Sequence, residues 1–171
     1  MTVNVGVIGT GMMGAAHART LASAVAGARV AAVSDADEAK ARGVAAEIDD
    51  RIRLYADPVE LINDADVDAV LVVSPDHTHE ALTIACVEAG KPVLCEKPLA
   101  ATAEDCLRVV GLEQAKGRRL VQLGYMRRFD PAYVDMKKVL DSAEIGRPLL
   151  MHCAHRNAVA LPFFTSEMPI T

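Results

Sequence analysis

The chain has 171 residues, of which 51% are hydrophobic and 24% charged, a composition typical of a globular protein and far from that of a disordered one. A formal net charge of -5 argues against a nucleic-acid-binding protein, because such proteins carry clusters of lysine and arginine that contact phosphates. No stretch reaches 18 consecutive apolar residues and no basic segment precedes an apolar one at the N-terminus, so we expect neither a membrane span nor an export signal.

The first element is a short strand in VNVGVIG, which ends in glycines. Apolar residues then recur at helical spacing at Ala18, Leu21, Ala22 and Val25, so a strand, a tight turn and a helix follow one another. The same alternation continues with a strand in ARVAAVSD, a helix over 37–48, a short RIRLY segment and a short helix. That last helix is predicted from Asp57-Pro58, which have the residue types of an N-cap and a first helical position.

Two nearly continuous apolar strands come next, VDAVLVVSP and PVLCE, separated by a helix over about 78–89 that Gly90 closes. Uninterrupted apolar strands that alternate with helices indicate a parallel sheet covered on both faces. We therefore predict an α/β fold with a doubly wound parallel sheet of the Rossmann type.

The remainder of the chain predicts a capped helix from Thr102 to about 116, a strand in RRLVQLGYMRRF, a helix from Asp130-Pro131 to about 140, and a strand in PLLMHCAHR. We place a domain boundary near residue 120. Residues 1–120 are then a dinucleotide-binding domain. Residues 121–171 are too few to bury a stable core of their own, and we expect them to be the incomplete start of an α+β sheet domain.

The four cysteines contain no C-x-x-C pair, and three of them lie in apolar runs, where a free cysteine behaves as a small hydrophobic residue. We therefore expect a reduced, cytoplasmic protein.

The segment GTGMMG, residues 9–14, matches the dinucleotide-binding pattern G-x-G-x-x-G. Gly9 would make the tight turn, Gly11 would let a pyrophosphate approach the backbone, and Gly14 would let the helix pack on the strand. Because the pattern follows a predicted strand and opens a predicted helix, we expect residues 9–14 to bind a dinucleotide. Met12 and Met13 belong to this loop as cofactor-binding candidates, although packing of the helix and loop is a simpler explanation for them.

Asp35 ends the second strand, about 20 residues after the glycine loop, where a ribose-binding acid is expected. A carboxylate there would repel a 2′-phosphate by about 4 kcal/mol per unit charge at 4 Å for an effective dielectric constant near 20. That repulsion predicts NAD rather than NADP as the cofactor. The alternative is that Asp35 caps the helix over 37–48, which would leave the choice open.

Ser74 and Pro75 end the fourth strand, and His77 and His79 follow in a polar loop. Ligands of open parallel sheets bind outside the carboxyl ends of the strands, so this loop should border the nicotinamide half of the cofactor. A metal site is the competing interpretation of H-x-H, but no acid or cysteine stands at ligand spacing, and we expect no metal.

Glu96, Lys97 and Pro98 lie at the carboxyl end of the next strand, where the same rule places the reacting centre. A lysine there can donate a hydrogen bond to a substrate hydroxyl, or take its proton once burial lowers the pKa of the amine. Proline restricts the preceding residue to extended geometry, and a cis Lys-Pro bond would direct the side chain into the cleft. The alternative is a surface turn with an ordinary ion pair.

Four motifs, GTGMMG, SPDHTHE, CEKPLA and GYMRRFDPAY, together resemble the Gfo/Idh/MocA oxidoreductase family over the whole chain. GYMRRFDP looks most like the myo-inositol 2-dehydrogenase branch of that family. The resemblance implies NAD-dependent oxidation of a ring hydroxyl of a cyclitol or sugar, with Lys97 as the active-site lysine. It also implies that Glu96 and His79 shape the cofactor pocket, that Met126 and Arg127 touch substrate and nicotinamide, and that His155 and Asn157 face the polyol.

Members of this family are longer than the present chain, and their catalytic aspartate and histidine lie in a D-x-x-x-H element that would begin near its end. The resemblance therefore implies that this chain alone is inactive and that the longer polypeptide forms a homo-oligomer, commonly a tetramer. A non-catalytic NAD-binding sugar sensor and a dehydrogenase of another pyranose are the alternative functions, and Lys97 argues against the sensor.

Overall fold

In the computed structural model, which describes residues 2–154, six parallel strands form one sheet in the order β3-β2-β1-β4-β5-β6. This order and direction are those of the doubly wound dinucleotide-binding fold, as predicted. The strands are β1 (Val3–Ile8), β2 (Ala28–Ser34), β3 (Arg53–Tyr55), β4 (Ala69–Val72), β5 (Val93–Cys95) and β6 (Val121–Leu123).

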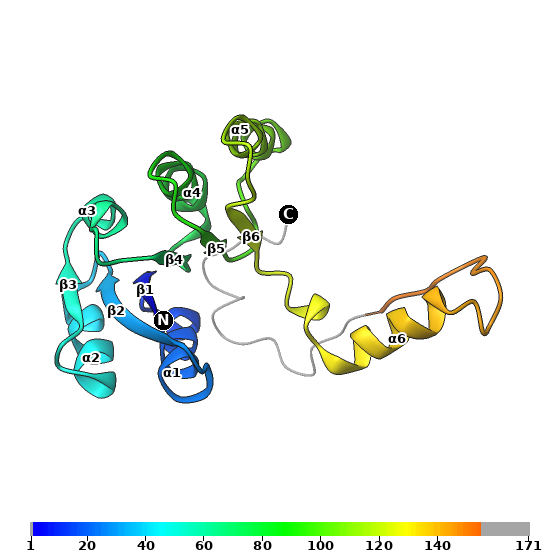
Figure 1. The fold of residues 1–171 in the computed structure, drawn as a ribbon, viewed down its shortest axis with the longest axis horizontal. Helices are drawn as coiled ribbons and strands as arrows, with labels where there is room; N and C mark the ends of the chain where they lie inside the picture. Colours follow the sequence, from blue (N-terminus) through cyan, green and yellow to red (C-terminus); the bar gives the residue numbers. More distant parts are fainter. Residues whose placement is uncertain (1, 155–171) are drawn as a thin grey trace, which may run out of the picture. The chain divides into compact units, whose positions relative to one another are not determined.

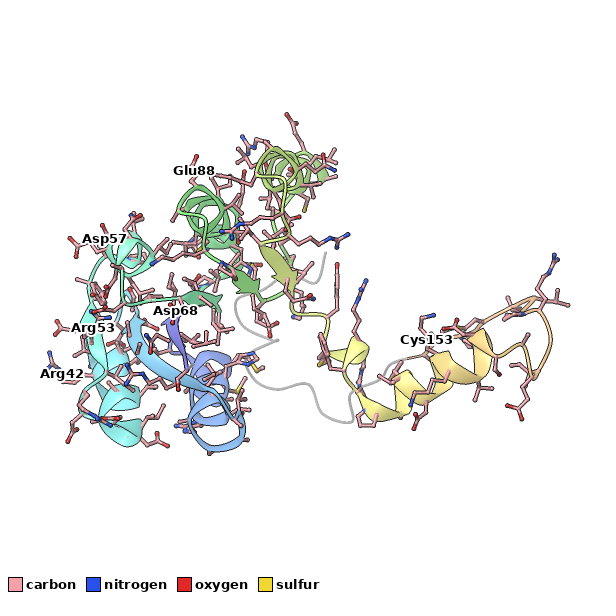
Figure 2. All side chains as sticks on the ribbon, viewed as in Figure 1. Arg42, Arg53, Asp57, Asp68, Glu88 and Cys153 are labelled. Atoms are coloured by element: carbon pink, nitrogen blue, oxygen red, sulfur yellow. The ribbon has the colours of Figure 1, made fainter. Side chains whose placement is uncertain are left out.

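Helices cover both faces of the sheet, α1 (Met12–Ala24) and α2 (Glu38–Ile48) on one side and α3 (Pro58–Asn63), α4 (His79–Glu88) and α5 (Ala103–Ala115) on the other (Figure 1). Two apolar clusters fill the layers, one beneath α1 and α2 and one beneath α3 and α4. Charged side chains such as Arg42 on α2 and Glu88 on α4 point away from the sheet (Figure 2). None of the helices between residues 2 and 154 is long and apolar enough to cross a membrane.

Side-chain caps fix where several helices begin. The carboxylate of Asp57 accepts a hydrogen bond from the Val59 amide at the start of α3, and Pro58 occupies the first helical turn. The Thr102 hydroxyl likewise accepts from the Asp105 amide at the start of α5. These caps confirm the predicted starts of both helices.

The chain separates into two compact units, residues 1–126 and 127–171. The first unit extends beyond the boundary expected near residue 120, because β6 pairs with β5 and so completes the sheet. A short 3₁₀ turn, η2 (Met126–Arg128), spans the division between the units.

The second unit contains α6 (Pro131–Asp141), which starts as predicted with the Asp130 carboxylate accepting from the Ala132 amide. The strand predicted in PLLMHCAHR is not present in its described part, residues 148–154. Leu149 and Leu150 are 86% and 90% exposed, and a strand is stable only where a neighbouring strand takes up its backbone hydrogen bonds.

Candidate cofactor and active site

The glycine turn between β1 and α1 has the geometry that a dinucleotide needs. Gly9 has a positive φ of 91°, and a Cβ there would lie 2.5 Å from the backbone nitrogen of Ser74. A Cβ on Gly14 would lie 1.8 Å from the carbonyl oxygen of Gly9, so only glycine allows α1 to pack this closely on the turn. A Cβ on Gly11, by contrast, would meet nothing within 4 Å, which leaves open space beside the backbone.

The N-terminus of α1 opens onto the same space. Gly11 is its N-cap and provides no side-chain cap, so the first amides of the helix are left to bind a ligand. Such a terminus favours anions such as a pyrophosphate. Met12 and Met13 are 73% and 50% exposed, so packing does not explain them. They remain candidates for contact with the cofactor.

Asp35 follows β2 and is tied to the glycine turn. Its Oδ2 accepts hydrogen bonds from the Thr10 amide (2.6 Å) and the Thr10 hydroxyl (2.9 Å), and its Oδ1 accepts from the Asp37 amide (2.9 Å). Burial alone would raise the pKa of Asp35, but these hydrogen bonds outweigh it and lower the pKa. The cap of α2 is Asp37, which accepts from the amides of Ala39 and Lys40, so the alternative that Asp35 caps this helix is wrong.

The end of β4 presents the next group of candidates. The hydroxyl of Ser74 is half-buried and lies 2.6 Å from the Thr78 hydroxyl, while Pro75 and His77 are exposed. His79 differs from these residues because it is 2% exposed, with both ring nitrogens bonded to backbone oxygens. Its ring thus supports the ends of two strands from inside the protein. Within residues 2–154, no group of three or more histidine, cysteine or acidic side chains is placed to hold a metal.

Glu96, Lys97 and Pro98 follow directly after β5, so the predicted lysine is at the predicted edge of the sheet. The Lys97-Pro98 bond is cis, as expected. Lys97 is exposed, so this chain does not itself provide the burial that was expected around the amine.

Glu96 joins this segment to α1. Its Oε1 lies 3.0 Å from Nε2 of His17, and its Oε2 accepts a 3.3 Å hydrogen bond from the Lys97 amide. The acid therefore holds the backbone of the lysine against the helix that starts at the glycine turn.

Sequence reasoning missed His17 and Thr10. His17 lies three residues after Gly14, almost one helical turn, and this spacing was the available signal that it faces the same end of the sheet. Thr10 stands inside the glycine pattern, where the pattern itself specifies no side chain. Each of them contacts a predicted site residue: His17 contacts Glu96, and Thr10 contacts Asp35.

Of the other residues expected to contact substrate, the structure describes Met126 and Arg127. Met126 is 66% exposed at the end of the first unit. Arg127 belongs to the second unit, where its Nη1 lies 2.6 Å from Asp130 Oδ2 and its guanidinium carbon lies 5.0 Å from the centre of the Tyr133 ring. His155 and Asn157 lie outside the described residues.

A hollow of about 530 Å³ lies at the opposite edge of the sheet, where β1, β2 and β3 begin. Three arginines line it, but each already has a partner: Arg29 donates to Asn4, Arg51 to Asp49, and Arg53 to Asp64 and Asp66. Since its cations are paired and it is remote from the glycine turn, we do not assign the cofactor to it.

The carboxyl edge fits a dinucleotide on three counts. A phosphate has open space at Gly11 and unpaired amides at the start of α1, and a ribose has a carboxylate at Asp35 held in place by Thr10. A carboxylate has about four lone-pair sites and three are used, so Asp35 can accept about one further hydrogen bond, from a ribose hydroxyl.

A family model described as "Oxidoreductase family, NAD-binding Rossmann fold" matches residues 3–125. The chain belongs to the Gfo/Idh/MocA oxidoreductase family. This membership makes NAD its cofactor, in agreement with the geometry of the glycine turn and of Asp35.

Curated members of the Gfo/Idh/MocA family match the chain over its whole length. It is 72% identical to inositol 2-dehydrogenase 1 of Saccharopolyspora erythraea, covering 100% of this chain and 51% of that protein. It is 48% identical to inositol 2-dehydrogenase of Azotobacter vinelandii, with the same two coverages. The chain thus spans about half the length of these relatives.

Solved structures of the family agree with the fold. Myo-inositol dehydrogenase from Lactobacillus casei, in complex with NAD(H) and myo-inositol, is 41% identical with a TM-score of 0.84, over 87% of this chain and 44% of that one. Scyllo-inositol dehydrogenase from the same organism, with bound NAD(H) and scyllo-inositol, is 29% identical with a TM-score of 0.80, over 85% and 43%. These relatives are named as dehydrogenases, so the sensor alternative is not favoured.

Proposed function

We propose that the chain is the cofactor-binding half of an NAD-dependent dehydrogenase that oxidises a ring hydroxyl of a cyclitol. One observation carries the proposal. The glycine turn after β1 contacts the end of β4, and β4 pairs with β5, at whose carboxyl end Lys97 stands. The glycine turn and Lys97 therefore share one edge of the sheet, where ligands of this fold bind, and this supports the proposal.

Each candidate residue has a role in this proposal. When bound, NAD supplies the hydride acceptor at C4 of the nicotinamide. Lys97 donates a hydrogen bond to the substrate hydroxyl and stabilises the negative charge that develops on its oxygen. The proton acceptor is expected in a D-x-x-x-H element within the half of the relatives that this chain does not match. Arg127, His155 and Asn157 are proposed to orient the other ring hydroxyls, because a misplacement of 1 Å can cost about 100-fold in rate, and Met126 is proposed to contact substrate and nicotinamide.

Myo-inositol is the substrate we propose, since the relative at 72% identity is named inositol 2-dehydrogenase 1. Scyllo-inositol is the nearest competitor, because a structure that binds it shares the fold. We also propose a cytoplasmic location, in keeping with the free thiols of Cys86, Cys95, Cys106 and Cys153, and a homo-oligomeric longer polypeptide.

The cofactor part of the proposal is tested by Gly11→Ala. The new methyl group has open space and the φ of Gly11 is −63°, so we expect the urea unfolding curve to change little. The same methyl group occupies the space where the pyrophosphate approaches, so we expect NAD affinity, measured by calorimetry, to fall at least tenfold. Unchanged NAD affinity would exclude the glycine turn as the phosphate site. Gly43→Ala on α2, equally free of contacts, is the matched control.

The catalytic part is tested in a polypeptide extended to the length of the relatives. We expect NADH to form with myo-inositol, and Lys97→Met to abolish this while NAD affinity stays within about threefold. Activity of the Lys97→Met variant close to that of the unaltered enzyme would show that the lysine has no part in the reaction.

A further inference from the structure

His79 is the first residue of α4 and is 2% exposed. Its Nδ1 lies 2.6 Å from the carbonyl oxygen of Pro98, and its Nε2 lies 2.8 Å from the carbonyl oxygen of Ser74. Both are hydrogen-bond distances, and each joins the ring to the segment after a different strand.

A backbone carbonyl oxygen can only accept a hydrogen bond, so each ring nitrogen must donate. A neutral imidazole has one N–H, and its other nitrogen would turn a lone pair towards a carbonyl oxygen inside the protein. Only the imidazolium satisfies both contacts. Two donating nitrogens would give the ring a positive charge although it is buried and the oxygens that it contacts belong to the backbone rather than to a carboxylate.

The surroundings are consistent with this charge. The titratable side chain beside the ring is Cys95 on β5, which favours the charged form of His79 by hydrogen bonding and by its charge. Burial lowers the pKa of His79, but Cys95 and the carbonyls of Pro98 and Ser74 outweigh it and raise the pKa to about 9. Glu80, the next residue of α4, forms its ion pair with Arg108 instead.

A cation is poorly suited to the start of a helix, where the helix dipole favours negative charge. The charge on His79 is thus opposed by burial and by the position of the ring on α4. The two contacts to carbonyl oxygens offset these costs. We therefore explain the buried position of the His79 ring by the two segments that it connects.

We infer that His79 is a buried imidazolium that clamps the carboxyl end of β4 to the turn that carries Lys97, and so positions the lysine relative to the glycine turn. On one side, Ser74 lies against Gly9, at which any Cβ would collide with the Ser74 backbone. On the other side, Pro98 directly follows Lys97 in the chain. His79 is a positioning residue, because it acts through these two segments and touches neither cofactor nor substrate; this part of the inference rests on the proposed function.

The protonation state is tested by nitrogen-15 NMR of the 171-residue chain labelled at histidine. At about pH 8 an unperturbed imidazole is mostly neutral, whereas we expect both ring nitrogens of His79 to keep imidazolium chemical shifts and their protons. A neutral tautomer at that pH would overturn the inference. This measurement needs no NAD, so it decides the protonation state even if the chain fails to bind the cofactor.

The positioning role is tested with His79→Gln, whose single amide can donate to the carbonyls without a charge, and with His79→Phe, which removes both donors. We expect NAD affinity to fall about tenfold or more in the Phe variant and less in the Gln variant. In the unaltered chain NAD affinity should weaken as the pH rises through about 9, and this step should be absent in both variants. If the Phe variant does not fold, the Gln variant and the pH profile decide.

Thr83→Val is the matched control, since Thr83 is fully buried on the same helix one turn later and is not part of the clamp. Its NAD affinity and pH profile should equal those of the unaltered chain. A folded His79→Phe variant with unchanged NAD affinity and an unchanged pH profile would overturn the positioning role.

Discussion

The side chain of Asp35 stabilises the glycine turn through Thr10 and is also placed to bind a ligand. The carboxylate holds the turn through two hydrogen bonds from Thr10 and one from the Asp37 amide, and about one of its four lone-pair sites is left for a ribose. Sequence spacing predicted the acid, but not the threonine that fixes it, because a loop residue between two glycines has no periodic pattern to reveal its partner.

Asp35→Asn should therefore weaken discrimination against NADP. The amide keeps an acceptor for Thr10 and loses the charge that repels a 2′-phosphate, so we expect the ratio of NAD to NADP affinity to fall by about tenfold or more. Calorimetric titration with both cofactors measures this ratio. Asp50→Asn, an exposed acid that follows α2, is the control and should leave the ratio unchanged. An Asn variant that still rejects NADP as strongly would show that the carboxylate does not set the preference.

The raised pKa of His79 predicts how stability varies with pH. A group whose pKa is higher in the folded than in the unfolded chain stabilises the fold fully below its unfolded pKa, here 6.5, and loses that contribution as the pH rises through about 9. The urea midpoint of the unaltered chain should fall across this window, whereas the midpoint of His79→Gln should change less. Parallel pH profiles for the two proteins would contradict the prediction.

At the scale of elements, local signals predicted helix starts better than they predicted contacts. Asp57, Thr102 and Asp130 act within three residues of their own position, so each cap could be recognised from neighbouring sequence. The pair of His17 and Glu96 joins residues 79 positions apart, which only the folded sheet brings together. The strand expected at residues 148–156 required a partner strand, and no local pattern shows whether one is present.

Helix α4 contains a buried side-chain polar atom that has no hydrogen-bond partner in the described part of the chain, the hydroxyl oxygen of Thr83. Valine has nearly the same shape and lacks the hydroxyl, so Thr83→Val should stabilise the chain by about 1 kcal/mol in urea unfolding. Thr20→Val on α1 is the matched control, because that hydroxyl is exposed and bonded to the Ala16 carbonyl, and it should change stability by less than about 0.5 kcal/mol. Destabilisation by Thr83→Val would mean that the hydroxyl has a partner in solution.

At the scale of the whole molecule, the chain should bind NAD without oxidising a polyol. We expect the described glycine turn and Asp35 to be enough for binding, whereas the relatives are about twice as long and are expected to carry the proton acceptor in the additional half. NAD at about 100 times its dissociation constant should stabilise the chain by about 2.7 kcal/mol, seen as a higher melting temperature.

NADH absorbance with myo-inositol provides the complementary measurement and should stay at background. Rapid NADH formation by residues 1–171 would show that the proton acceptor lies within this chain. A melting temperature that NAD leaves unchanged would instead count against the binding site itself.

The contacts that hold the carboxyl edge in place, Asp35 with Thr10, Glu96 with His17, and His79 with Pro98, all lie before the division after Met126. None of them requires a residue from the second unit. If the polypeptide beyond the junction selects the substrate, as proposed, recombination there would exchange the specificity and leave these contacts intact. On this proposal, the same cofactor-binding unit would serve different polyols when the polypeptide beyond the junction is replaced.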